Sequence, residues 1–520
     1  MDLTAALQEI DSRDHVIETR DHEIAVLSSD NRLLRQELAS IRQGIFGSKT
    51  ERLLPGQLAL FGQKSVLPAL PDKEPQEVKE KSKSKGHGRQ TFSAALPREE
   101  QNFNLPEEER ICSCCNEVMR KIKEQVTERG EIIPKRVIVH RYIASVYACP
   151  NGHEVCTAPV PEPVVPRAKY EASVYAHLVV SKYGDHIPLN RLEGIFKRNG
   201  LHLPKQTMWD MLCAVDDLVA QPIIEQMRLE ILESDVLHSD DTTIKVKVEG
   251  QKGSKQGHIW TWRTPRPLTP NDEPCKTFVE FTLGRNRTGP QEFLGNWDGT
   301  LIIDGLAVYN EVIAVNGIKR AGCWAHARRG FVKALKSGTK AAALMLAPMH
   351  RLFWIERAIL KRAKERNLSK EDIFALRKRV RDKRSREVQL LIFERAFDLQ
   401  DQPTTMPESQ LGKALGYLVR QSESLQLCVD EPRIPIHNND AERDLRHVAI
   451  GRNNYHAFSS EKGGAVAARL YTLILSAKHA GINPEAYIRD LLTAISTTPA
   501  SEIWRLTPWA WAKSHPESKI

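Results

Sequence analysis

The sequence lacks any apolar run that approaches the roughly eighteen residues needed for a membrane-spanning helix. Its first residues, Met1-Asp2-Leu3-Thr4, also lack the basic and apolar regions of a secretory signal peptide. These two absences predict a cytoplasmic protein.

Cysteine is scarce, and its number is odd. There are nine cysteines in 520 residues, which argues against a disulfide framework in a cytoplasmic protein. Cys213, Cys275, Cys323 and Cys428 are scattered and are expected to be buried thiols. The others lie between Cys112 and Cys156, and this clustering indicates a metal site.

The length and charge of the chain give broad limits. A chain of 520 residues is too long for one hydrophobic core, so several domains are expected. The hydrophobic content of 41% is low but normal for a globular protein. A net charge of +9 and a pI near 9.0 favour a polyanionic partner such as DNA.

Three acidic residues have distinctive settings. Asp240 lies in His238-Ser239-Asp240-Asp241-Thr242, and Asp304 follows the apolar run Leu301-Ile302-Ile303. Glu442 lies in His437-Asn438-Asn439-Asp440-Ala441-Glu442-Arg443, which is typical of the first turn of a helix. Two Asp on strands and one Glu on a helix can hold hard divalent cations such as Mg²⁺. Taken alone, an Asp after an apolar strand is more often a turn or cap residue.

These segments resemble the DDE transposases of the insertion-sequence-66 family. His238 to Thr242 resembles a His-x-Asp-Glu-Thr motif, with Asp241 in place of Glu, and Asp304-Gly305 to Tyr309 resembles Asp-Gly-Tyr-x-x-Tyr, with Leu306 departing. The family's Asn-Asn-x-x-Glu-Arg-x-x-Arg motif is matched by Asn438, Asn439, Glu442, Arg443 and Arg446. Cys323 to Arg329 resembles a further signature, and Gly451 to Asn454 carries Asn453 where the family usually has Lys.

The resemblance implies roles for individual residues. Asp240, Asp304 and Glu442 would hold two Mg²⁺ or Mn²⁺ ions in a ribonuclease H-like domain. Asp241 competes with Asp240, but neighbours on a strand point to opposite faces, and the family register selects Asp240. The candidate DNA-binding residues are His326, Arg328, Arg329, Arg446, Arg452 and Lys205.

The first 46 residues carry a heptad repeat. Leu3, Ile10, Ile17, Ile24, Asn31, Leu38 and Ile45 share one position. The pattern predicts a two-stranded parallel coiled coil, and hence a homodimer or higher oligomer. A single amphipathic helix packed on the body is the alternative. Residues 47–100 are expected to form a linker.

Residues 101–165 are predicted to form a zinc-binding domain. Cys112 and Cys115 form a Cys-x-x-Cys knuckle, which can place two thiolates on one Zn²⁺. Cys149 would be the third ligand, and His153 or Cys156 the fourth. Reduced cysteines without a metal are the alternative.

The remaining chain divides into five predicted parts. Residues 166–234 are helical, and the helices at 188–196 and from 205 on suggest a helix-turn-helix that presents Lys205, although a plain helical hairpin is an equal alternative. Residues 235–330 form the first part of the catalytic domain, with strands at 236–238, 244–248, 258–263, 277–282, 301–303 and 319–324. Residues 331–430 form a basic helical insertion expected to contact DNA. Residues 431–480 carry the Glu442 helix, and residues 481–520 form a C-terminal helical segment.

The predicted fold is therefore multidomain α/β, with a ribonuclease H-like mixed sheet, a helical insertion, a coiled coil and a small zinc-binding domain. The predicted function is metal-dependent cleavage and strand transfer at the ends of a bacterial insertion sequence, with accessory proteins of the same element as further candidate partners. A non-catalytic DNA-binding relic and a structure-specific ribonuclease H-like nuclease are the alternatives.

Overall fold

The structure, a computed structural model, describes residues 137–141, 143, 146–148, 155–157, 161–166, 168–250, 253–285 and 288–519. The chain divides into two compact units, residues 66–140 and the remainder, and almost all described residues belong to the second unit. The predicted coiled coil and linker, together with Cys112, Cys115, Cys149 and His153, lie outside the described residues. Of the region around the predicted zinc site, the structure describes a short antiparallel pair, β1 (Val146–Ala148) and β2 (Val155–Thr157).

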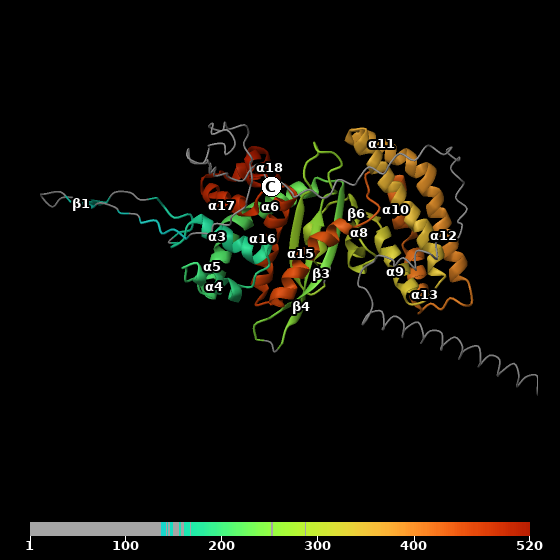
Figure 1. The fold of residues 1–520 in the computed structure, drawn as a ribbon, viewed down its shortest axis with the longest axis horizontal. Coiled ribbons are helices and arrows are strands. Elements are labelled where there is room, and N and C mark those ends of the chain that lie inside the picture. Colours follow the sequence, from blue (N-terminus) through green and yellow to red (C-terminus); the bar gives the residue numbers. More distant parts are fainter. Residues whose placement is uncertain are drawn as a thin grey trace, which may run out of the picture. The chain divides into compact units, whose positions relative to one another are not determined.

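A six-stranded mixed sheet lies at the centre of the larger unit (Figure 1). Its strands are β3 (Val236–Val246), β4 (Lys255–Arg263), β5 (Thr277–Leu283), β6 (Thr300–Ile302), β7 (Lys319–Ala321) and β8 (Ala457–Phe458). The order is β5-β4-β3-β6-β7, and β8 pairs with the far end of β3. The first three strands are antiparallel, whereas β6 and β7 run parallel to β3.

Helices outnumber strands in the described residues, so the fold is mixed α/β with a helical majority. The helices before the sheet are α3 (Ala172–Val179), α4 (Leu189–Arg198), α5 (Lys205–Val215) and α6 (Gln221–Leu232). Those between strands are α7 (Thr288–Leu294) and α8 (Asn310–Asn316). After β7 come α9 (Trp324–Lys336), α10 (Ala342–Glu365), α11 (Lys370–Val380), α12 (Arg386–Gln400), α13 (Gln410–Arg420), α14 (Ser422–Asp430), α15 (Asn439–Tyr455), α16 (Glu461–His479), α17 (Pro484–Ala494) and α18 (Pro508–Ser514).

Three apolar clusters surround the sheet. Ile244, Ile259 and Val279 pack against α3–α6 and α16–α18 on one face. Trp260, Trp262 and Phe293 form a second cluster with α7 and α8, and the rings of Trp262 and Phe293 stack with centroids 4.5 Å apart. The third cluster lies among α9–α14 and reaches β6 and β7, so these helices form a body of their own beside the sheet (Figure 1).

Most helices and strands predicted within the described residues are confirmed, with two corrections. The strands predicted at 236–238 and 244–248 are one continuous strand, because β4 pairs with β3 from His238 to Val246. The strand predicted at 319–324 ends at Ala321, and Trp324 instead begins α9. The helix pair predicted around Asn199-Gly200 is present as α4 and α5, and Gly200 has the left-handed φ of +80° that favours glycine.

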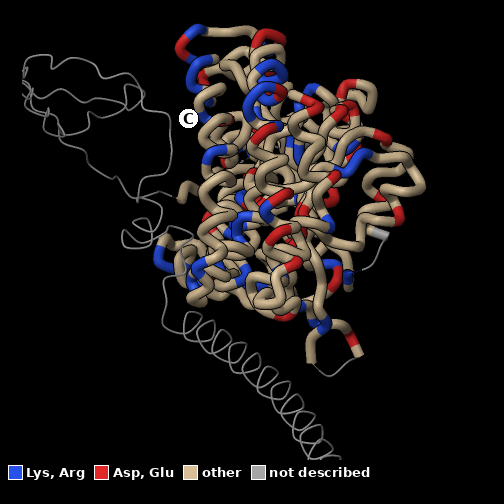
Figure 2. The backbone as a smooth tube through the Cα atoms, turned by 90° about the vertical axis from the view of Figure 1, so that its right-hand side faces the viewer, with Lys and Arg blue, Asp and Glu red and all other residues tan. Residues whose placement is uncertain are grey.

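The basic insertion differs from a simple charged face. Arg377 and Arg381 are buried, and both contact Glu356 of α10: Arg377 Nε lies 2.9 Å from Oε1 and Arg381 Nη2 lies 2.8 Å from Oε2. These two arginines therefore hold helices together instead of facing solvent. Viewed from the side of these helices, Lys and Arg are interspersed with Asp and Glu (Figure 2). No helix among the described residues is both long and apolar enough to cross a membrane.

Candidate active site

Strand register places Asp240 and Asp304 close together. In the parallel pair of β3 and β6, Val236 is opposite Thr300 and His238 is opposite Ile302. Two residues further along both segments, Asp240 lies level with Asp304, which follows the end of β6. Leu306 N donates to Asp304 Oδ1 (3.1 Å), and Arg320 Nη2 donates to its carbonyl oxygen (3.1 Å), so this loop is held at the strand end.

Asn438 brings Glu442 to the same edge of the sheet. Asn438 is fully buried and immediately precedes α15. Its Nδ2 donates to the Ser239 carbonyl oxygen (2.7 Å), and its Oδ1 accepts a hydrogen bond from His238 Nδ1 (2.9 Å). Its backbone N donates to Cys323 Sγ (3.1 Å). The first turn of α15, which carries Glu442, is thereby tied to the strand that carries Asp240.

The three carboxylates influence one another electrostatically. Burial first, and then the charges of Asp304 and Glu442, raise the pKa of Asp240 to about 8, although a hydrogen bond from the Asp241 backbone lowers it. Like charges gathered in a partly buried site disfavour ionisation unless a cation compensates them. The donor set therefore fits a hard divalent cation, which takes carboxylate oxygens as ligands.

In the structure, protein cations already compensate Glu442. Arg329 Nη2 of α9 donates to Oε1 (3.1 Å) and Oε2 (2.9 Å), and His326 Nε2 lies 3.4 Å from Oε1. Within the described part of the chain, no three His, Cys, Asp or Glu side chains are grouped closely enough to hold a metal ion. Glu442 is thus turned toward α9, while Asp240 lies within β3 and Asp304 lies two residues after β6.

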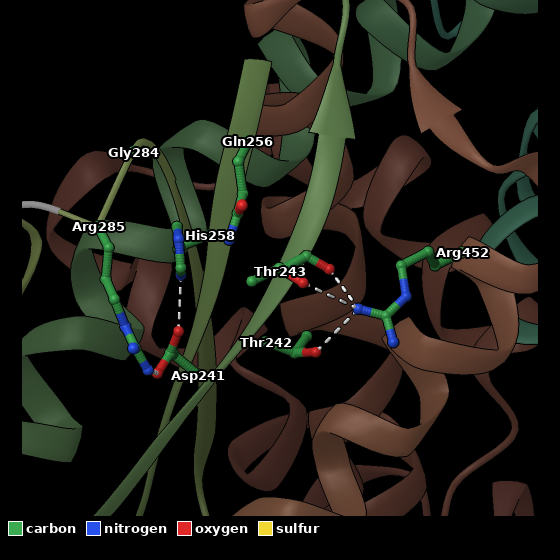
Figure 3. Close-up of a pocket in the computed structure, with 8 residues that line it drawn as sticks. All are labelled: Asp241, Thr242, Thr243, Gln256, His258, Gly284, Arg285 and Arg452. Carbon is green, nitrogen blue, oxygen red and sulfur yellow. Dashed lines mark hydrogen bonds and ion pairs between the residues drawn. The ribbon is translucent and has the colours of Figure 1, made fainter. Parts of the chain in front are cut away.

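Asp241 points to the opposite face of β3, as strand alternation predicts. Its Oδ2 lies 2.7 Å from His258 Nδ1 and its Oδ1 lies 2.7 Å from Arg285 Nη2, and its side chain is only 4% exposed. Figure 3 shows these side chains around a cavity of about 620 Å³. Asp241 is therefore already satisfied by two partners.

Arg452, a predicted DNA-binding residue, lines the same cavity from α15 (Figure 3). Its Nη1 donates to the carbonyl oxygen of Thr243 and to Oγ1 of Thr242, the latter at 3.2 Å. It therefore holds the exposed part of β3 beside α15.

The other predicted DNA-binding residues lie at two places. His326, Arg328 and Arg329 lie on α9, partly buried, and Arg446 is exposed one turn after Glu442 on α15. Lys205 is exposed at the first residue of α5, in the helical segment before the sheet. The structure thus gathers the α9 and α15 residues around Glu442 but does not bring Lys205 to them.

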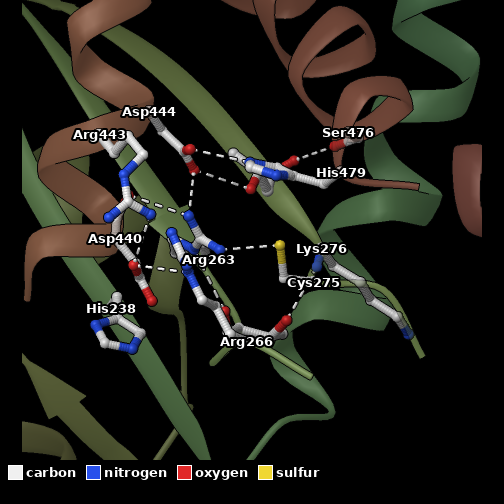
Figure 4. Close-up of polar contacts among 12 residues, drawn as sticks. His238, Arg263, Arg266, Cys275, Lys276, Asp440, Arg443, Asp444, Ser476 and His479 are labelled. Carbon is white, nitrogen blue, oxygen red and sulfur yellow. Dashed lines mark hydrogen bonds and ion pairs between the residues drawn. The ribbon is translucent and has the colours of Figure 1, made fainter. Parts of the chain in front are cut away.

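Two further acidic residues of α15 were missing from the sequence predictions. Asp440 and Asp444 flank Glu442 by two residues and so point to another side of the helix. Buried Arg263 of β4 contacts Asp444 Oδ2 (3.1 Å), and Arg266 Nε contacts Asp440 Oδ1 (2.8 Å; Figure 4). His479 of α16 lies 2.9 Å from Asp444 Oδ1. This network fixes the rotation of α15, and the alternation of Asp440, Glu442 and Asp444 was the signal that could have indicated it.

Comparison with known proteins identifies related sequences. Residues 167–466 match the family described as Transposase IS66 family, and residues 472–509 match the IS66 C-terminal element. Residues 109–151 match a zinc-finger binding domain of transposase IS66, which includes Cys112, Cys115 and Cys149. Residues 33–100 match a segment described as Transposase C of IS166 homeodomain.

Related chains occur in Sinorhizobium fredii. Uncharacterized protein y4jD is 29% identical over 509 residues, covering 92% of this chain and 94% of the relative. Uncharacterized protein y4hP is 28% identical over 431 residues, which cover 78% of this chain and 74% of the relative. Because the transposase match covers more than half of the sequence, this chain belongs to the IS66 transposase family.

Proposed function

We propose that the chain is a catalytically active DDE transposase of a bacterial insertion sequence. It binds the ends of the element, hydrolyses a phosphodiester, and joins the freed 3′ hydroxyl to target DNA. Its sheet is ribonuclease H-like in this proposal, which the three antiparallel strands followed by two parallel strands support.

The observation that carries the proposal is the convergence of three acidic segments: Asp304 follows β6 level with Asp240 of β3, and Asn438 ties the first turn of the Glu442 helix to β3. Asp240, Asp304 and Glu442 come from distant parts of the sequence, yet the charges of the other two raise the pKa of Asp240. These residues would hold Mg²⁺ or Mn²⁺, two per site. When bound, such ions stabilise charge on phosphate oxygens and lower the pKa of water.

Two phosphoryl transfers make up the reaction. In the first, a water oxygen bonds to phosphorus, the bond to the 3′ oxygen breaks, and that oxygen gains a proton. In the second, the 3′ hydroxyl oxygen loses its proton and bonds to a target phosphorus, the bond from that phosphorus to the target's own 3′ oxygen breaks, and the released oxygen gains a proton. His326, Arg329 and Arg446 lie where they could meet charge on the phosphoryl oxygens.

Other parts of the chain would bind DNA and assemble the complex. Arg328, Arg452 and Lys205 would contact DNA phosphates. Cys112, Cys115 and Cys149, with His153 or Cys156, would hold one structural Zn²⁺. The N-terminal heptads would join two or more chains in the cytoplasm, and small proteins of the same element are candidate partners.

Glu442→Gln tests the proposal. The amide keeps the shape of the side chain but removes a negative charge from the site, so cleavage and joining should fall below detection. Binding of element-end DNA should be almost unchanged, because phosphate contacts elsewhere dominate affinity. Gel-shift and Mg²⁺-dependent strand-transfer assays on the same preparations provide the measurement.

The alternatives give different results in the same assays. Cutting without joining by the wild-type protein would indicate a nuclease, and binding without cutting would indicate a non-catalytic relic. Normal joining by Glu442→Gln would remove Glu442 from the catalytic set.

A further inference from the structure

The exposed face of α10 combines an aromatic ring with positive charge. Trp354 is 55% exposed, which is unusual for so large a side chain. His350, Arg357 and Lys361 are exposed at positions that share this face by helical spacing. Arg351, Arg362 and Lys364 are exposed as well, whereas Glu356 is buried and Glu365 is the last residue of the helix.

This basic face of α10, defined by His350, Trp354, Arg357 and Lys361, begins close to the candidate active site. The ring of Phe353, next to Trp354, stacks on His437 with centroids 6.3 Å apart and planes inclined by 18°. His437 directly precedes Asn438, which ties α15 to β3.

Helix α10 also packs against α9 in the same apolar cluster. Burial lowers the pKa of His350, and the positive charges of Arg357 and Arg328 lower it further. Arg328 is adjacent to Arg329, which contacts Glu442. Positive side chains therefore lie on two helices that pack against each other, and one of these helices contacts Glu442.

We propose that this face binds the DNA strand that leaves the site, with Trp354 stacked on an unpaired base and Arg357 and Lys361 near its phosphates. Charge complementarity favours a polyanion over a protein surface, because the exposed charges of α10 are five Arg and Lys and one acid, Glu365, which pairs with Lys361. An exposed indole ring favours an unpaired base, since a duplex keeps the faces of its bases stacked within the helix. The inference rests on the proposed function, because the bound strand is that of the transposase substrate.

Equilibrium binding of fluorescein-labelled oligothymidylate to the full-length protein, without divalent metal, tests the proposal. Anisotropy should show that Trp354→Ala weakens binding about tenfold, because stacking supplies much of the affinity for single strands. Trp354→Phe should stay within about threefold of wild type, because it keeps a stacking ring. Arg357→Gln should reduce the salt dependence by the equivalent of about one phosphate contact.

A matched control is available on the neighbouring helix. Phe397 of α12 is 50% exposed, and Arg395 Nη1 nearby donates to the carbonyl oxygen of Leu344 (3.0 Å). Leu344 precedes Trp354 by ten residues on α10, about 15 Å along the helix. Phe397→Ala should bind oligothymidylate like wild type, and a duplex of the same length should respond much less to Trp354→Ala.

Wild-type affinity in Trp354→Ala would overturn the proposal. The proposal would also be overturned if Trp354→Ala changed the molecular mass measured by light scattering but not the affinity for DNA, because the face would then bind a second copy of the chain. Failure of the proposed function is distinguishable, since it would appear as normal joining by Glu442→Gln whatever the behaviour of Trp354. Matching circular dichroism of all variants establishes that each is folded.

Discussion

At the scale of single residues, Arg329 controls whether the carboxylate of Glu442 is available to a metal ion. Its two hydrogen bonds to the carboxylate oxygens occupy the atoms that a divalent cation would need. Hydrogen bonds between charged groups contribute about 1.5–3 kcal/mol each to stability. A cation that binds the three carboxylates must therefore displace Arg329 from Glu442.

Arg329→Ala should raise the affinity of the DNA-free protein for Mn²⁺ by roughly tenfold, which corresponds to about 1.4 kcal/mol. Electron paramagnetic resonance of free Mn²⁺ provides the measurement. Lys333→Ala, one turn further along α9 and exposed, is the control and should have no effect. Weaker Mn²⁺ binding by Arg329→Ala would show that the arginine supports the site instead of competing for it.

His479 gives a pH-dependent test of the network behind α15. Burial alone would lower its pKa, but the hydrogen bonds and charges of Asp444 and Cys275 raise it to about 9 from the usual 6.5. A raised pKa means that the proton stabilises the fold. This contribution is complete below pH 6.5 and is lost as the pH rises through about 9.

His479→Gln should therefore lower the free energy of unfolding by about 2 kcal/mol at pH 6. The difference from wild type should shrink above pH 9, where wild-type His479 has lost its proton. Urea denaturation of both proteins at several pH values gives the result. A constant difference from pH 6 to pH 10 would contradict the charged pair.

The local sequence pattern predicted the orientation of the candidate site residues but not the side chains that contact them. The opposite orientation of Asp240 and Asp241 follows from strand alternation, and Glu442 in a first helical turn follows from the Asn438-Asn439 start. The contact of Arg263 with Asp444 could not be predicted, because it joins a strand and a helix that only the tertiary fold brings together. The same holds for Arg329 and Glu442.

At the scale of secondary structure, β3 is the strand whose extent the sequence pattern predicted least well. Four polar residues, Asp240 to Thr243, interrupt its apolar pattern and predicted a break. Pairing with His258 to Thr261 of β4 keeps this segment in the strand despite its low apolar content. A polar stretch is thus compatible with a continuous central strand that carries a candidate site residue.

The contacts of Glu356 show that some basic residues of the insertion are buried in ion pairs and are not part of its surface. It contacts both Arg377 and Arg381, all three being largely buried, and so joins α10 to α11 and to the segment that follows α11. Loss of one partner from a buried ion pair leaves uncompensated charge and costs about 3–5 kcal/mol. Glu356→Gln should destabilise the protein by that order.

Chemical denaturation provides the measurement for Glu356→Gln. Glu365→Gln is the matched control on the same helix, because its pair with Lys361 is exposed, with side chains 61% and 78% accessible. It should change stability by less than about 0.5 kcal/mol. Equal, small effects of both substitutions would mean that the buried cluster does not stabilise the insertion.

At the scale of the whole molecule, the candidate site lies where separate parts of the chain meet. Helices α9–α14 form their own apolar cluster beside the sheet, and α15 then returns to β3. The sequence predicted this order of elements, but not that α9 would supply cations to Glu442. The proposed site therefore requires the whole mixed sheet and α15 to fold together, because only then do Asp240, Asp304 and Glu442 come near one another.

The most direct test compares two adjacent residues on opposite faces of β3. Asp240→Asn and Asp241→Asn remove the same charge, but only Asp240 faces Asp304 and Glu442, whereas Asp241 contacts His258 and Arg285. Mg²⁺-dependent cleavage and joining of element-end DNA should be lost in Asp240→Asn and retained in Asp241→Asn, even if the latter is less stable. Activity in Asp240→Asn beside an inactive, folded Asp241→Asn would contradict the assignment of the active site.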